Sequence, residues 1–163
     1  MKQSIIYAGT LIDSNMKSYD RTEKACKKMK MNLHSLYGIG LNRNGMNSIT
    51  NTTIWKRIVL PTALYSCELW GTLTFAETKM LEQTQRYFVR FVLGLDKRSP
   101  TDSCTSAVGL WSIQGLIDKF KLLFLGRLLR AKSNTTHKQL FILRLSQLLL
   151  GESDKRSITY DLI

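Results

Sequence analysis

Apolar side chains recur at helical spacing along most of this chain. From a cap at Ser18 or Asp20, a helix is predicted to run to about residue 37 and to end at Gly38. Its apolar face is formed by Ala25, Cys26, Met29, Leu33, Leu36 and Tyr37. The rest of its circumference is mostly lysine, so this helix is expected to present a basic face to its surroundings.

Residues 49–70 also have a helical pattern, but Pro61 interrupts it. Proline removes a backbone donor and disfavours helical geometry in the preceding residue, so a kink or two helices meeting at Pro61 are predicted. The clearest helix follows. Thr74 and Glu77 have the capping-box spacing, and Gly94 provides the stop. Its predicted core face is Met80, Leu81, Tyr87, Phe88, Phe91, Val92 and Leu95, with Arg86 and Arg90 on the opposite side.

Two helices are predicted in the last third of the chain. The first is capped by Ser112 and covers about residues 113–131; apolar residues surround most of it, which is typical of a central helix packed on several sides. Arg127 is unusual because it falls on an apolar side of this helix. The second covers residues 136–150. With one or two brief strands in residues 4–12, the fold class is mainly α: a small bundle of about five helices with a short N-terminal strand or hairpin.

Charge narrows the range of partners. The 163 residues include 24 Lys and Arg against 12 Asp and Glu, a net charge of +12 that is spread along the whole chain. An excess of this size favours a polyanion, and nucleic acid before a membrane surface. The sequence contains no apolar run long enough to cross a bilayer and no secretory signal, so an intracellular protein of the nucleus or cytoplasm is expected.

Residues suited to catalysis are sparse. The 3 cysteines are far apart, only 2 histidines are present, and no nucleophile motif, phosphate-binding loop or paired Asp-Asp occurs. Neither a metal site nor another cofactor is therefore expected. One carboxylate, Glu68, lies among apolar residues in PTALYSCELW, residues 61–70. If it is buried it needs a basic partner, and Arg90 and Arg127 are both candidates.

Several motifs occur together in an order that resembles a known family. They are YAGTLID near the start, then IWKRIVLPTALYSCELW, LEQTQRYFVRFVLGL and VGLWSIQGLIDKFKLLFLGRL. Over about residues 5–130 this order resembles the end of a LINE-type (non-LTR) retrotransposon reverse transcriptase. The family pattern has a tyrosine-leucine-glycine strand, and then a proline followed by a tyrosine-glycine-x-glutamate-x-tryptophan motif. This chain departs from it at Ala8, where leucine is usual, and at Ser66, where glycine is usual.

The resemblance implies a domain plan and a place for particular residues. Residues 1–17, with Tyr7 and Gly9, would be a remnant of the palm strand near the primer grip. Residues 18–151 would be a helical thumb-like domain, and residues 152–163 a flexible tail. The thumb would contain Pro61, Tyr65, Glu68 and Trp70 as structural positions, with Arg90 and Gly94 in its next helix. Arg127, on the apolar side of a later helix, is expected to be a further structural position. The family's aromatic-Ala-Asp-Asp loop, which binds the catalytic magnesium, has no counterpart here, so the chain is expected not to be an enzyme by itself.

The function implied is that of a non-catalytic thumb-like fragment, which contacts the RNA or DNA backbone without sequence specificity. Phosphate contacts do not depend on sequence, and cations on helix faces suit them. The expected nucleic-acid-binding residues are Lys24, Lys27, Lys28, Arg86, Arg90, Lys97 and Arg98. Alternatives are a helical module that binds protein or self-associates through exposed apolar faces, and an element remnant without selected function. No membrane partner is expected.

Overall fold

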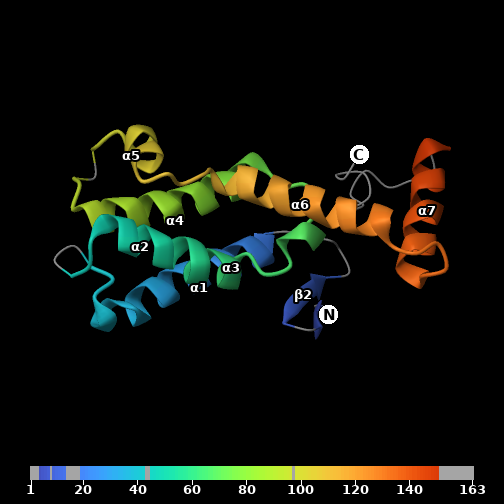
Figure 1. Cartoon of the computed structure of the whole chain (residues 1–163), viewed down its shortest axis with the longest axis horizontal. Coiled ribbons are helices and arrows are strands. Elements are labelled where there is room, and N and C mark those ends of the chain that lie inside the picture. Colours follow the sequence, from blue (N-terminus) through green and yellow to red (C-terminus); the bar gives the residue numbers. More distant parts are fainter. Residues whose placement is uncertain (1–3, 8, 14–18, 43–44, 97, 151–163) are drawn as a thin grey trace. The chain divides into compact units, whose positions relative to one another are not determined.

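The computed structural model describes residues 4–7, 9–13, 19–42, 45–96 and 98–150 (Figure 1). The mainly helical class predicted from the sequence is confirmed. The chain divides into two compact units, each considered by itself below. One contains residues 19–65 and 74–115, here called the α1–α5 unit. The other contains the described parts of residues 1–18, 66–73 and 116–163, here called the hairpin unit. The predicted boundaries at 17/18 and 151/152 fall beside or within undescribed residues and stay a prediction.

The α1–α5 unit is built around the pair α1 and α4, with α3 also packing on α1 and α5 on α4. Its α-helices are α1 (Tyr19–Ser35), α2 (Ser48–Ile54), α3 (Leu60–Ala63), α4 (Phe75–Leu93) and α5 (Thr101–Ala107). Short turns of other helix types are η1 (Tyr37–Ile39) and η2 (Trp55–Val59). The core includes Met29, Leu33, Trp55, Leu81 and Phe88, all of them almost completely buried. Trp55 and Phe88 stack face to face with their ring centroids 4.0 Å apart.

The first helix ends earlier and differently from the prediction. α1 stops at Ser35, and a 3₁₀ turn continues the chain to Gly40, whose φ of 99° provides the left-handed stop that was expected at Gly38. The predicted core residues up to Leu33 are buried. Tyr37, beyond the end of α1, is exposed, because the tighter 3₁₀ turn changes the direction in which its side chain points.

The helix around Pro61 is not broken at the proline. Leu60 keeps helical angles (φ −62°, ψ −49°), although a residue before proline usually disfavours them. The predicted meeting of two helical segments is present, since η2 ends at Val59 and α3 begins at Leu60. A π-turn at Trp55–Val59 directly precedes the proline, and the Leu60 N–H donates to the Trp55 carbonyl. Such a turn widens the helix locally, which gives room to a proline ring that a regular helix does not accommodate. The chain leaves the helix after Ala63, at Leu64 and Ser66.

The predicted boundaries of α4 are confirmed at both ends. The Thr74 hydroxyl accepts from the Glu77 N–H, and the Glu77 carboxylate accepts from the Thr74 N–H at 2.7 Å, which is a complete capping box. Gly94 ends the helix at φ 63°. The buried face is rotated from the predicted one, since it includes the polar residues Thr84 and Gln85 while Tyr87 is exposed. The Gln85 amide donates to the Trp111 carbonyl at 2.8 Å, which offsets part of the cost of burying it.

The hairpin unit contains the antiparallel strands β1 (Ser4–Tyr7) and β2 (Thr10–Asp13), the turn η3 (Cys67–Leu69), most of α6 (Ile113–Arg130), and α7 (Thr136–Leu149). The Thr10 and Ser66 hydroxyls are hydrogen-bonded at 2.7 Å, which joins β2 to the segment before η3. The Lys138 ammonium donates to the carbonyls of Leu129 and Ala131 and so satisfies the end of α6.

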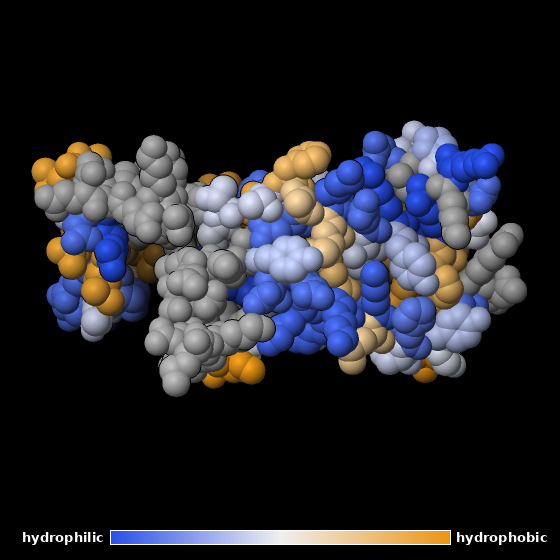
Figure 2. Space-filling model, turned by 180° about the vertical axis from the view of Figure 1, so that it is seen from behind, coloured by the Kyte–Doolittle hydropathy of each residue, from blue (hydrophilic) through white to orange (hydrophobic). Residues whose placement is uncertain are grey.

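The two late helices have the predicted bounds to within one residue, but the described residues do not enclose α6 on several sides. Leu122, Leu123 and Leu129 are about half exposed or more, so the prediction of a central helix is wrong. Exposed apolar side chains also occur on α7, at Leu140, Ile142 and Leu143, and Figure 2 shows hydrophobic residues on the surface of this helix. No helix in the described part of the chain is both long and apolar enough to cross a membrane.

Candidate nucleic-acid interface

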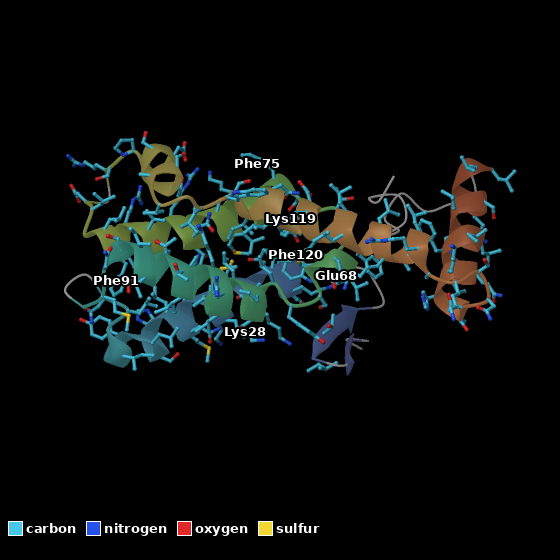
Figure 3. All side chains as sticks on the ribbon, viewed as in Figure 1. Lys28, Glu68, Phe75, Phe91, Lys119 and Phe120 are labelled. Carbon is cyan, nitrogen blue, oxygen red and sulfur yellow. The ribbon has the colours of Figure 1, made fainter. Side chains whose placement is uncertain are left out.

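A groove of about 650 Å³ runs between α1 and α4. Its residues come from one face of each helix: Glu23, Cys26, Lys27, Lys30, His34, Met80, Gln83, Thr84 and Tyr87. A second hollow of about 630 Å³ continues along α4 and is formed by Gln83, Arg86, Tyr87, Arg90, Phe91 and Leu95. Gln83 and Tyr87 belong to both, so the two hollows adjoin, and together they are called the α1–α4 groove below. Figure 3 labels Lys28 on α1 and Phe91 on α4, the two helices that form it.

Cations dominate the charge of this groove. Lys27 and Lys30, one helical turn apart on α1, are both exposed. Arg86 and Arg90, one turn apart on α4, are half-buried. Glu23 is the single carboxylate among the residues that line either hollow. Side chains spaced by three or four residues lie on the same side of a helix, so each helix contributes a pair of cations to the groove.

The two arginines differ in how far their charge is already compensated. Arg86 forms an ion pair with Asp102 of α5, with Nη2 and Oδ1 3.3 Å apart, and the Asp102 side chain is 90% exposed. Arg90 has a long hydrogen bond from Nη2 to the Ser99 carbonyl at 3.5 Å, and its buried Nε has no partner in the described part of the chain. A half-buried guanidinium without a carboxylate is stabilised by an anion that approaches it from solution.

Four rings line up beside these cations. His34 and Tyr87 have centroids 6.5 Å apart, Tyr87 and Phe91 are 6.3 Å apart, and Phe91 and Tyr37 are 5.9 Å apart. Tyr87 is 42% exposed and Tyr37 is 53% exposed. The row therefore belongs to the surface of the α1–α5 unit, unlike the buried pair of Trp55 and Phe88.

The structure brings together some of the predicted site residues. Lys27, Arg86 and Arg90 line the groove. Lys24 and Lys28 are exposed on α1 but do not line it, Arg98 is exposed beyond α4, and Lys97 lies outside the described residues. Lys30, His34 and Tyr87 were not among the predicted site residues. The spacing of three between Lys27 and Lys30 places both on one side of α1 and was a signal for Lys30. The sequence offered Tyr87 as one of several aromatic residues that could stack on bases, and a core position was preferred for most of them.

The residues of PTALYSCELW lie in different surroundings. Pro61 and Tyr65 are exposed and Trp70 is buried. Glu68 is half-buried and forms no ion pair among the described residues; Arg127 is exposed, with its guanidinium 5.9 Å from the centroid of the Phe124 ring. The predicted Glu68–arginine contact is therefore wrong in the described part of the chain. Because Glu68 is only half-buried, water can solvate its carboxylate and no arginine is needed.

In comparisons with family models, with curated proteins and with solved structures, nothing matches this chain. Within the described residues, no group of three or more His, Cys, Asp and Glu side chains is placed to hold a metal ion. The resemblance to non-LTR reverse transcriptases, the absence of catalysis and the absence of a cofactor all stay predictions.

Proposed function

We propose that the chain is a non-catalytic thumb-like element of a non-LTR reverse transcriptase, which holds the backbone of RNA or DNA in the α1–α4 groove. The observation that carries this proposal is the pairing of Lys27 and Lys30 on α1 with Arg86 and Arg90 on α4, in a groove with one lining carboxylate. Such an arrangement attracts phosphates of any sequence.

The backbone at Ser66 supports the family part of the proposal. Ser66 has a φ of 59°, in the left-handed region that favours glycine, and it is the one residue other than glycine with a positive φ in the described part of the chain. The family pattern has glycine at this position. Glycine is the residue that adopts this left-handed backbone without penalty. The backbone at position 66 therefore fits the glycine of the family pattern, although this chain has serine there.

The test uses two double charge reversals on the same helix. Lys27→Glu with Lys30→Glu changes the groove, and Lys24→Glu with Lys28→Glu is the matched control, because it makes the same change of charge on exposed residues that do not line the groove. Affinity for two nucleic acids of unrelated sequence is measured by fluorescence anisotropy at several salt concentrations. The slope of log K against log salt is expected to fall in magnitude by about 2 for the groove variant, one for each lost phosphate contact.

Both sequences are expected to lose the same factor in affinity, since phosphate contacts carry no sequence information. The control variant is expected to keep a steeper salt dependence than the groove variant. Equal losses in the two variants would show that general charge governs binding, and would overturn the assignment to the groove. If the unmodified chain bound neither nucleic acid at low salt, the proposed function itself would be wrong.

A further inference from the structure

We propose that the α1–α4 groove takes single-stranded nucleic acid, with an unpaired base stacked on the ring of Tyr87. This rests on the proposed function and adds the kind of nucleic acid and the contact that selects it.

The exposure of Tyr87 is the first observation. A tyrosine on a helix that packs against another helix normally buries its ring, as Phe88 does one residue later. Tyr87 instead keeps 42% of its surface exposed and lines both hollows of the groove. An exposed aromatic ring is a stacking platform for any base, because every base has a π-face.

The neighbouring rings hold Tyr87 in place. His34 approaches it from α1 with an interplanar angle of 56°, and Phe91 lies one helical turn away at an angle of 21°. Phe91 in turn contacts Tyr37 at 48°. A ring supported by neighbours from two segments loses little freedom when a base covers its open surface, so less of the stacking energy is spent on ordering it.

The cations lie where a stacked nucleotide needs them. Lys27 and Lys30 share one hollow with Tyr87, and Arg86 and Arg90 share the other. A strand whose base stacks on Tyr87 therefore has cations for its phosphates in both hollows. In a duplex the base faces are covered by the neighbouring base pairs, so a duplex gains the phosphate contacts alone. We therefore expect the α1–α4 groove to bind a single strand more tightly than a duplex.

The experiment compares two ligands that have the same charge. One is a six-nucleotide oligothymidine, and the other is an oligomer of the same length whose residues are all abasic. Both are titrated into the unmodified chain and into Tyr87→Leu and Tyr87→Phe, with circular dichroism to check helix content. Tyr87→Leu keeps apolar volume but removes the ring, whereas Tyr87→Phe keeps the ring.

The unmodified chain is expected to bind oligothymidine about tenfold more tightly than the abasic oligomer, which corresponds to one stacked base. Tyr87→Leu should remove this difference by weakening oligothymidine binding alone, and Tyr87→Phe should preserve it. The variant with Lys27→Glu and Lys30→Glu should weaken both ligands by the same factor.

Two results would overturn the stacking inference while leaving the proposed function intact. One is equal affinity of the unmodified chain for the two ligands, which needs no variant and so does not depend on how well a variant folds. The other is an equal effect of Tyr87→Leu on both. Failure of both ligands to bind at low salt would instead remove the proposed function and this inference together.

Discussion

At the scale of single residues, the backbone of Ser66 is strained. Its φ of 59° places a serine side chain in the left-handed region, where a β-carbon is unfavourable by about 1 kcal/mol. Its hydroxyl is bonded to Thr10, so the residue also contributes a tertiary hydrogen bond within the hairpin unit. These two effects oppose each other and have to be separated by substitution.

Ser66→Gly and Ser66→Ala both remove the hydroxyl, but only glycine relieves the strain. We expect Ser66→Gly to be more stable than Ser66→Ala by about 1 kcal/mol in urea unfolding, because the two variants differ only in the β-carbon. Equal stabilities would mean that Ser66 is not strained in solution.

The neighbouring Cys67 thiol has a strongly shifted pKa. Burial raises the pKa of Cys67 to about 12, and the negative charge of Glu68 adds to the effect. The side chain is completely buried. Because the folded pKa is higher than the unfolded one, this thiol stabilises the fold fully below about pH 9 and loses that contribution as the pH rises from about 9 to 12.

Cys67→Ser provides the comparison, since serine does not titrate in this range. Between pH 8 and 10.5 the free energy of unfolding of the unmodified chain is expected to fall by up to about 2 kcal/mol more than that of the variant. Urea unfolding at the two pH values measures the difference. Parallel pH dependences would show that the thiol is solvated rather than buried.

At the scale of the elements, the boundaries of α4 depend on its capping box. Thr74→Ala removes the acceptor for the Glu77 N–H and leaves the buried Glu77 carboxylate with one partner fewer. A loss of about 1 kcal/mol in the free energy of unfolding is expected. Thr53→Ala is the control, because the Thr53 hydroxyl is exposed and only donates to the Ile49 carbonyl within its own helix. If Thr74→Ala and Thr53→Ala lowered the free energy of unfolding equally, the capping box would stabilise α4 no more than an ordinary surface threonine does.

Elements were predictable where their signals are local. The capping box lies at the start of α4 and Gly94 at its end, and both signals were interpreted correctly from the sequence. The role of Glu82 was not predicted: its carboxylate accepts from the N–H groups of Ile113 at 2.6 Å and Gln114 at 3.3 Å. That contact caps the start of α6 from another helix, and no spacing within one helix reveals it.

The remaining errors have the same physical origin. The π-turn before Pro61 was not predicted, because it is one of several backbone solutions to a proline in a helix. The helix α5 was not predicted, since its seven residues are too few to show a periodic apolar face. Tyr87 was assigned to the core by hydrophobicity, but the buried face of α4 is centred on Thr84, Gln85 and Phe88.

At the scale of the whole molecule, the net charge of +12 does not by itself locate a binding site. Basic residues are spread along the sequence, and folding of the α1–α5 unit gathers two lysines and two arginines in the α1–α4 groove. The sequence predicted three of these four cations. It did not predict that they would converge on one exposed ring, because that convergence requires α1 and α4 to pack side by side.

The burial of the tryptophans makes the two units separately observable. Trp55 in the α1–α5 unit and Trp70 in the hairpin unit are 0% and 3% exposed, whereas Trp111 is 60% exposed. Replacement of Trp111 and one buried tryptophan by phenylalanine leaves a single fluorophore in one unit. Its emission shifts to longer wavelength only when that unit opens to water. The chain thus carries a spectroscopic reporter in each half, and any difference in the order of their melting can be recorded without an added label.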